Sequence, residues 1–300
     1  MQRRYATADV FTAEPFGGNP VAVVLDAEGL TTTQMQTLAA EFNYIETTFV
    51  LPAAVRAHTA HVRIFTPDRE VPFAGHPNIG TAFLLARKQV TAGVPLSGQF
   101  VFEEAAGLVR IGLLYEGDTI VGADLLSPQP LVRHAKVEVA RAAGSLGLTA
   151  EDVRTDVHVP QVISVGLPFL VLELASREAL RRARPDRRAY DTLFPLDGAR
   201  AVYAYTRDTG EDGTATYCEV HSRMFTWRLV EDPATGSATA ALTALLAELR
   251  GVDVRLRARQ GEDMGRTSTI LTRTVRDGAK IRTHVGGLCA PMFEGTFNLR

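Results

Sequence analysis

The spacing of apolar residues along this chain changes repeatedly between the period of a strand and the period of a helix. In the segment 60–65, AHVRIF, apolar Val62 and Ile64 alternate with polar residues, which predicts a strand with one buried face. Between residues 31 and 42, apolar residues instead recur every three or four positions, which predicts an amphipathic helix. Thr31 and Gln34 have the spacing of a capping box, so we expect this helix to begin there.

The same patterns predict the remaining elements. Strands are expected at 5–11, 21–25, 46–52, 163–174, 201–207 and 216–225, and within 100–126, where Gly107, Gly112 and Gly117 should interrupt them. Helices are expected at 137–148 and 176–183. From residue 254 onward the pattern is strand-like, and we expect the segment 285–299 to return and pair with the first part of the chain.

Two segments half a chain apart resemble each other. EVPFAGHPNIGTAFLLA occupies 70–86 and EDPATGSATAALTALLA occupies 231–247, and the two match at Glu, Pro, Gly and the final Leu-Leu-Ala. Upstream, RIFT at 63–66 corresponds to RMFT at 223–226, with one extra residue in the second copy before its Glu. The repeat predicts a duplicated domain with a cleft between two lobes, 1–128 completed by 288–300, and 129–287.

Each copy of the repeat leads from a strand through Pro and Gly into a helix, expected at 75–88 and at 236–250. Both helices are apolar nearly all round, so each is expected to lie buried inside a curved sheet. The first N–H groups of a helix lack internal partners and carry partial positive charge, which suits an anion or a developing enolate. Two ordinary buried helices whose starts meet only water would give the same pattern.

Composition narrows the class of protein. The chain has 300 residues, with 46% hydrophobic and 22% charged residues, a net charge of −2 and a pI near 6.4. These values are typical of a soluble globular protein and give no general attraction to nucleic acid or to an anionic membrane. The basic run 181–188 is expected to be a solvated face. Because neither a signal peptide nor a membrane-spanning apolar stretch is visible, we expect a cytoplasmic protein.

Familiar cofactor and metal motifs are missing from the sequence. GHPNIGT has the glycine spacing of a phosphate loop, but Thr81 stands where that loop requires Lys. Neither a dinucleotide fingerprint nor a nucleophile elbow occurs, and the close pair His58 and His61 has no third ligand at a suitable spacing. Cys218 and Cys289 form neither a metal-type pair nor a disulfide framework. We therefore expect no cofactor and no metal.

Four polar residues lie where their surroundings could make them reactive. Glu46 lies between the apolar pair Tyr44-Ile45 and the strand TTFVL, and partial desolvation would raise its pKa as a proton-shuttling group requires. His76 lies in the first turn of the first repeat helix, where the helix dipole favours a neutral imidazole. Asp232 and Ser237 flank the start of the second helix, and from spacing alone capping is the better prediction for Ser237. An ordinary surface Glu and a helix-start His remain open alternatives.

Several of these motifs occur in an order that resembles a known family. FTAEPFGGNPVAVV, ETTFV, FTPDREVPFAGHPNIGTA, EDPATGSATAAL, QGEDMGR and VGG together resemble the PhzF-like (phenazine biosynthesis) proteins, from residue 10 to about residue 287. The resemblance implies an α+β fold of the diaminopimelate epimerase type. In that fold two pseudo-symmetric lobes each wrap a curved, mostly antiparallel, barrel-like sheet round a central helix.

The resemblance also implies an activity and a set of site residues. PhzF isomerises trans-2,3-dihydro-3-hydroxyanthranilate with the Glu of the ETTFV segment as its acid–base group, which corresponds here to Glu46. His76 and Asp232 would bind the amino and hydroxyl groups of a substrate or relay protons, and Asn19 of GGNP would touch the substrate. The N–H groups that hold a substrate carboxylate would belong to Gly75, His76, Gly236 and Ser237. The resemblance further implies a homodimer.

Other features of the chain keep alternative functions open. Epimerases of this fold use a thiol at each helix start, but here those starts carry His76 and Ser237, which argues against a two-thiol racemase or epimerase. A binding protein for small carboxylates on the same fold, without catalysis, is a second alternative. Trp227-Arg228-Leu229 replaces a glycine-containing loop of the family before Asp232, so Trp227 would either narrow the pocket and stack on a ring or serve in packing. Asn78 replaces the Thr usual after GHP.

Overall fold

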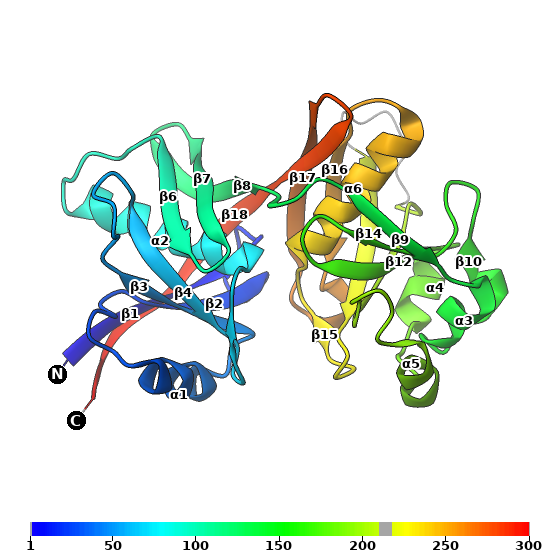
Figure 1. The fold of residues 1–300 in the computed structure, drawn as a ribbon, viewed down its shortest axis with the longest axis horizontal. Coiled ribbons are helices and arrows are strands. Elements are labelled where there is room, and N and C mark those ends of the chain that lie inside the picture. The colour runs from blue at the N-terminus through cyan, green and yellow to red at the C-terminus, as the bar shows by residue number, and fades with distance from the viewer. Residues whose placement is uncertain (1, 210–217, 300) are drawn as a thin grey trace. The chain divides into compact units, whose positions relative to one another are not determined.

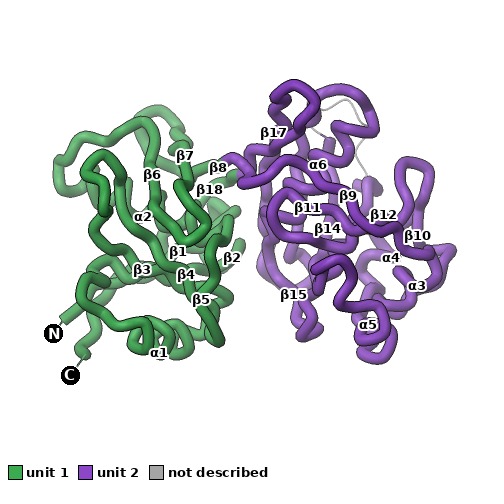
Figure 2. The backbone as a smooth tube through the Cα atoms, viewed as in Figure 1, with its two compact units in different colours: residues 1–125, 286–300 green, residues 126–285 purple. Residues whose placement is uncertain are grey.

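The computed structural model describes residues 2–209 and 218–299 and divides into two compact units. Unit 1 comprises Met1–Leu125 and Gly286–Arg300, and unit 2 comprises Leu126–Val285 (Figure 2). The lobes expected from the repeat differ from these boundaries by only a few residues. No helix within the described residues is long and apolar enough to cross a membrane.

The strands of unit 1 form a ring in which each pairs with its neighbours. β1 pairs antiparallel with β2, β2 parallel with β3, β3 antiparallel with β4, β4 parallel with β6, and β6 and β7 antiparallel with the next strand. β18 pairs with both β8 and β1, which closes the ring. The strands are β1 (Gln2–Val10), β2 (Asn19–Val24), β3 (Glu46–Leu51), β4 (Ala60–Phe65), β5 (Glu70–Val71), β6 (Gln99–Glu104), β7 (Gly107–Glu116), β8 (Thr119–Leu126) and β18 (Lys280–Asn298).

Unit 2 repeats this order of pairings. β11 is antiparallel to β12, β12 parallel to β13, β13 antiparallel to β14, β14 parallel to β16, and β16 antiparallel to β17. The α+β fold with two pseudo-symmetric units is therefore confirmed. The strands are β9 (Val132–Lys136), β10 (Val153–Arg154), β11 (Gln161–Ser164), β12 (Pro168–Leu174), β13 (Val202–Thr206), β14 (Cys218–Phe225), β15 (Glu231–Asp232), β16 (Arg255–Gln260) and β17 (Ser268–Asp277).

A buried helix lies within the sheet of each unit, as the repeat predicts (Figure 1). These helices are α2 (Gly75–Thr91), which runs past the expected end at residue 88, and α6 (Gly236–Arg250). In α2, Gly80 allows a close approach to the sheet, because a Cβ atom there would lie 2.5 Å from Val21 Cγ1 and 2.9 Å from Val10 Cγ2. The contact fixes the first turns of α2 against β1 and β2.

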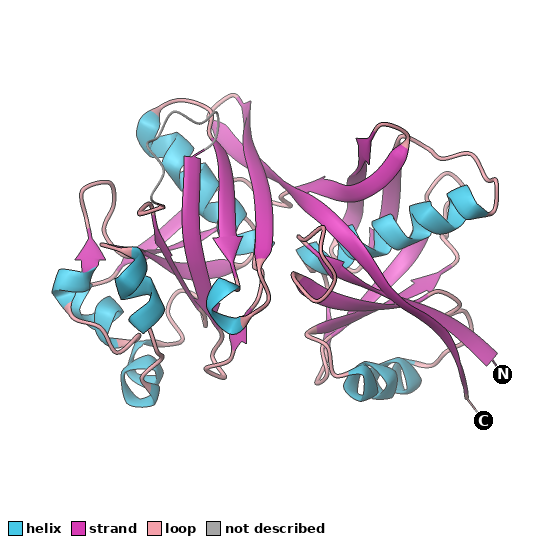
Figure 3. Ribbon diagram, turned by 180° about the vertical axis from the view of Figure 1, so that it is seen from behind, coloured by secondary structure: helices cyan, strands magenta, loops and turns pink. Residues whose placement is uncertain are grey.

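The other helices lie outside the strand layers that enclose α2 and α6 (Figure 3). In unit 1, α1 (Thr32–Phe42) has the predicted capping box between Thr31 and Gln34 and covers an apolar cluster that contains Met35, Phe49 and Phe65. In unit 2, a second cluster includes residues of α3 (Val139–Gly144), α4 (Arg177–Arg182) and α5 (Arg187–Leu193). Two 3₁₀ turns, Ala150–Asp152 and Glu262–Met264, complete the elements of the described residues.

Several sequence predictions of local structure were wrong. The segment 163–174 is two strands, because Gly166, with φ +145°, reverses the chain between β11 and β12. Gly112 lies inside β7 rather than between strands. The expected helix 137–148 is only six residues long. In contrast, the arginines of the basic run 181–188 are exposed, as expected, and the run also contains the start of α5, which Asp186 caps. Residues 216 and 217 of an expected strand lie outside the described residues.

Candidate active site

Unit 1 brings Glu46 and His76 together. Glu46 is the first residue of β3, and His76 is the second residue of α2, which packs against that part of the sheet. His76 Nδ1 lies 3.5 Å from Glu46 Oε2, and the two side chains are only 8% and 16% exposed. This distance is longer than a normal hydrogen bond, but catalytic hydrogen bonds are often long in unliganded enzymes. The pair is placed for proton transfer or for mutual orientation.

The imidazole of His76 is neutral over the whole physiological range. Burial lowers its pKa to about 3, and an interaction with the backbone of Pro20 opposes the shift only in part. A lowered pKa is what we expected for a histidine at a helix start, but the main cause is desolvation rather than the helix dipole. A neutral imidazole can donate one hydrogen bond and accept another without adding charge to the site.

Asn19 lies on the strand next to Glu46. It is the first residue of β2, is almost fully buried, and precedes Pro20 and Val21, the latter paired with Glu46 in the parallel ladder. The loop before it requires Gly18 at φ +58°, since a Cβ atom there would lie 2.2 Å from the Val10 carbonyl oxygen. The GGNP turn therefore sets where Asn19 enters the sheet.

Buried polar atoms without a hydrogen bond gather around the start of α2. Among the described residues, no hydrogen bond of normal geometry is made by His76 Nε2, Thr47 Oγ1, the amide atoms of Asn78, or either carboxyl oxygen of Glu104. Nearly all buried polar groups in proteins are hydrogen-bonded, so such a concentration is typical of a functional site. The sequence did not single out Thr47 or Glu104, and nothing in the local pattern distinguishes Glu104 from the adjacent Glu103.

In unit 2, Asp232 belongs to a buried hydrogen-bond network at the start of α6. Thr235 Oγ1 donates to Asp232 Oδ2 at 2.5 Å, and Gln260 Nε2 donates to the Asp232 carbonyl at 2.8 Å and to Thr235 Oγ1 at 2.9 Å. Thr235 N–H in turn donates to Gln260 Oε1 at 3.1 Å. The network holds the Asp232 carboxylate in one orientation. The sequence did not reveal that Gln260 and Thr235 contact Asp232.

The capping prediction for Ser237 was wrong. The N-cap residue of α6 is Thr235, so Ser237 is the second residue of the helix itself. No side-chain cap bond is made by Thr235, nor by Ala74, the N-cap of α2. Gly75 and Gly236 are therefore the first residues of two helices whose starts are not capped by their N-cap side chains, an arrangement that suits anion binding.

Trp227 lies in the turn between β14 and β15, a few residues before Asp232. Its side chain is 51% exposed, and the guanidinium of Arg228 lies 5.1 Å from its ring centroid. Leu229, rather than Trp227, packs against the apolar cluster of unit 2. Of the two roles that the sequence left open for Trp227, core packing is thus not the one observed.

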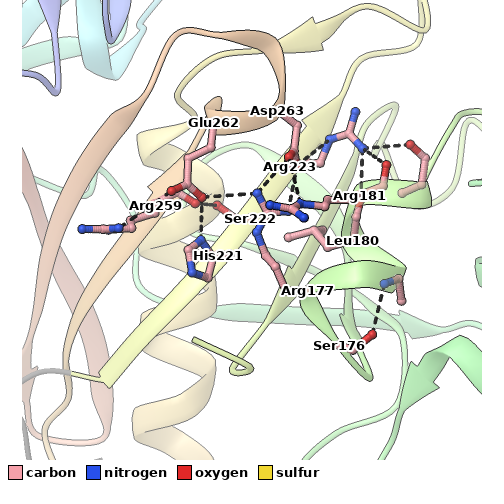
Figure 4. Close-up of polar contacts among 12 residues, drawn as sticks. Ser176, Arg177, Leu180, Arg181, His221, Ser222, Arg223, Arg259, Glu262 and Asp263 are labelled. Atoms are coloured by element: carbon pink, nitrogen blue, oxygen red, sulfur yellow. Dashed lines mark hydrogen bonds and ion pairs between the residues drawn. The ribbon is translucent and has the colours of Figure 1, made fainter. Parts of the chain in front are cut away.

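A second polar cluster in unit 2 borders a cavity of about 470 Å³. Arg177 binds both carboxylate oxygens of Asp263, at 2.8 and 2.9 Å, and His221 Nδ1 lies 2.5 Å from Glu262 Oε2 (Figure 4). The charged groups neutralise one another, so the cluster joins α4 to the 3₁₀ turn at 262–264. Within the described residues, no group of three His, Cys, Asp or Glu side chains is placed to hold a metal ion.

Comparison with known proteins shows the family and the fold of the chain. The family described as phenazine biosynthesis-like protein matches residues 8–295. An uncharacterised isomerase from Mesorhizobium japonicum is 39% identical, with 98% of each chain covered, and trans-2,3-dihydro-3-hydroxyanthranilate isomerase from Pseudomonas aeruginosa is 33% identical, with 97% and 98% covered. The crystal structure of a Bacillus anthracis phenazine biosynthesis protein of the PhzF family superposes over the whole of both chains with a TM-score of 0.87 at 21% identity, which shows the shared fold.

Proposed function

Because this chain belongs to the phenazine biosynthesis-like protein family, we propose that it is a cofactor-independent isomerase that moves a proton within a small cyclic or unsaturated acid. The observation that carries this proposal is the buried pair of Glu46 and the neutral His76 at the start of α2. A carboxylate beside a neutral imidazole can take a proton from carbon and return it without a metal or an organic cofactor. A substrate related to trans-2,3-dihydro-3-hydroxyanthranilate fits this chemistry.

In the proposed reaction the Glu46 carboxylate removes a proton from one carbon of the substrate. The electron pair of the broken C–H bond forms a new double bond to the neighbouring carbon. The electron pair of the original double bond then takes the proton back from Glu46 at the carbon at the far end of the allylic system. Atoms and charge balance, and the carboxylate is regenerated. His76 accepts or donates a hydrogen bond at a polar substituent while the negative charge is delocalised.

The remaining site residues are proposed to bind substrate. The N–H groups of Gly75, His76, Gly236 and Ser237 would hold the carboxylate, because helix starts favour anions. Asn19 and Asp232 would bind the amino or hydroxyl substituents. The network of Thr235 and Gln260 supports this role for Asp232, since Thr235 donates to one carboxylate oxygen and Gln260 donates to the Asp232 backbone carbonyl.

The test is turnover of purified protein on trans-2,3-dihydro-3-hydroxyanthranilate and on a panel of small unsaturated ring acids, followed by mass spectrometry and NMR of the products. Appearance of a double-bond isomer is expected for at least one acid. Tight binding of an acid, without turnover or exchange of its protons, would replace this proposal with a non-catalytic binding protein. Loss of optical rotation from one amino-acid enantiomer would instead indicate an epimerase.

We also propose that the enzyme works in the cytoplasm as a homodimer, as the family resemblance implies. Light scattering after size-exclusion chromatography should then give about twice the chain mass of 32.5 kDa. A single species at the chain mass would contradict the dimer and leave the chemistry of Glu46 unaffected.

A further inference from the structure

The turn between β6 and β7 contacts the segment that carries His76 at two points. The Ala106 N–H donates a hydrogen bond of 3.1 Å to the Pro72 carbonyl, just before α2 begins. Two residues after His76, the side chain of Asn78 lies beside the Glu104 carboxyl group. The turn thus holds the segment 72–78 on both sides of Gly75 and His76.

The Glu104–Asn78 contact is buried and incomplete in its hydrogen bonding. Asn78 is fully buried, and both of its amide atoms and both carboxyl oxygens of Glu104 lack a hydrogen bond of normal geometry to any described residue. A carboxylate would need a cation or several donors in such a place, and a neutral carboxylic acid needs only one acceptor. Asn78, whose side chain lies beside Glu104, carries one such acceptor, its amide oxygen.

Several charged groups on neighbouring elements of unit 1 have other partners. Glu103, the neighbour on β6, accepts hydrogen bonds from the Ala54 and Val55 N–H groups and pairs with His58. On β4 and β5, Arg63 binds both carboxylate oxygens of Glu70. On β3 and α2, Glu46 and His76 face each other. Burial accordingly raises the pKa of Glu104 to about 8, with the Asn78 amide opposing the shift.

We propose that Glu104, as a neutral acid, and Asn78 together hold the segment 72–78 so that His76 faces Glu46, which makes Glu104 a positioning residue for the acid–base pair. The proposal deepens the isomerase function and rests on it. Ionisation of Glu104 would place a negative charge in a buried site where no cation of the described residues pairs with it, and the segment would have to shift or admit water. Activity should therefore have an alkaline limit that Glu104 sets.

The kinetic test compares pH profiles of kcat for wild type, Glu104→Gln, Glu104→Ala and, as the matched control, Glu103→Gln. We expect wild-type kcat to fall about tenfold per pH unit above about pH 8. Glu104→Ala should lose about tenfold in kcat at neutral pH with a smaller change in KM. Glu104→Gln, which cannot ionise but keeps a donor, should restore neutral activity and remove the alkaline limit, whereas Glu103→Gln should retain it. An unchanged alkaline limit in Glu104→Gln would overturn the proposal.

A second measurement does not depend on turnover. The imidazole signals of His76 in an NMR titration from pH 6 to 10 should shift with an inflection near pH 8 in wild type and stay constant in Glu104→Gln. Because this readout uses the unliganded protein, it separates the proposal from the choice of substrate. His76 signals that do not change over this range in wild type would refute the positioning role, even if the isomerase activity were established.

Discussion

Burial near the start of α2 shifts two titratable groups in opposite directions and keeps both neutral. The pKa of His76 falls to about 3 and that of Glu104 rises to about 8, since desolvation penalises the charged form of each. The nearby Glu103 carboxylate behaves differently. Hydrogen bonds from Ala54 N–H, His58 and Val55 N–H lower its pKa to about 2. Two adjacent glutamates thus differ in charge because their side chains meet different surroundings.

The raised pKa of Glu104 predicts how the free energy of unfolding depends on pH. In the unfolded chain Glu104 releases its proton near its ordinary pKa of 4.5, but in the folded chain only near 8. The contribution of Glu104 to the free energy of unfolding is fully present below pH 4.5 and is lost as the pH rises to about 8. Its upper limit is about 1.4 kcal/mol for each unit by which the pKa is raised. Glu104→Gln should therefore unfold at a higher urea concentration than wild type at pH 8 to 9, and the difference should shrink toward pH 5.

Urea unfolding of both proteins at pH 5, 7 and 9 measures this effect, with Glu103→Gln as the control. A difference between wild type and Glu104→Gln that is the same at all three pH values would mean that Glu104 is not protonated in the folded protein at neutral pH.

The sequence identified residues by their place in motifs, and it could not identify their partners. Glu46, His76 and Asp232 follow from ETTFV, GHP and DPATGS, respectively. Glu104 and Gln260 did not, because each reaches its helix start from a strand distant in sequence. From spacing alone Ser237 was predicted to be a cap, since Ser is a common N-cap type, but the N-cap is Thr235 and the helix begins two residues earlier than that role requires.

Among the secondary-structure elements, both copies of the repeat contain an ion pair as well as a helix start. Arg63 binds Glu70 in unit 1, and Arg223 binds Glu231 in unit 2, each through two hydrogen bonds. Each arginine also lies over a phenylalanine two residues on, Phe65 or Phe225. The residues shared by RIFT and RMFT thus stabilise the turn that leads into the helix of each unit. The extra residue of the second copy lies in this turn, where Leu229 has a φ of +60°.

The two copies of the ion pair provide a matched pair of substitutions. Arg223 is 4% exposed and also donates to the carbonyl oxygens of Leu180 and Ala183, whereas Arg63 is 21% exposed. Arg223→Leu would leave Glu231 and these carbonyls without their donor in a buried place, so it should lower the free energy of unfolding by about 3 kcal/mol. Arg63→Leu should cost about 1 kcal/mol.

Chemical denaturation of both variants measures the two costs. Equal losses would show that burial does not distinguish the two copies. The expected difference between the two losses of unfolding free energy does not depend on catalysis, so this measurement is independent of the proposed function.

At the scale of the whole molecule, the chain returns to its beginning. β18 pairs with β1 from Gln2↔Asn298 to Val10↔Cys289, so the last residues complete the ring of unit 1. The sequence predicted this return and the duplicated plan, because apolar alternation and the repeated motifs are local signals. It missed the hairpin of β11 and β12, since a continuous apolar run does not show where a glycine reverses the chain.

Removal of residues 286–300 should therefore unfold unit 1 and spare unit 2. Without these residues β1 and β8 lose their common neighbour and the ring opens at two edges. Hydrogen exchange followed by mass spectrometry should show lost protection in 2–125 and retained protection in 126–285. Full protection of β1 in the truncated chain would contradict the role of β18 in closing the ring.

Glu46 is proposed to move a proton between two carbons of a small acid. The most direct test is incubation of wild type, Glu46→Gln and the exposed control Glu28→Gln with trans-2,3-dihydro-3-hydroxyanthranilate in deuterated water, with deuterium at each product carbon read by NMR and mass spectrometry. We predict isomerised, deuterated product from wild type and Glu28→Gln, and a loss of at least about a thousandfold in Glu46→Gln with its fold unchanged. Full turnover and deuterium incorporation by Glu46→Gln would show that Glu46 is not the acid–base group.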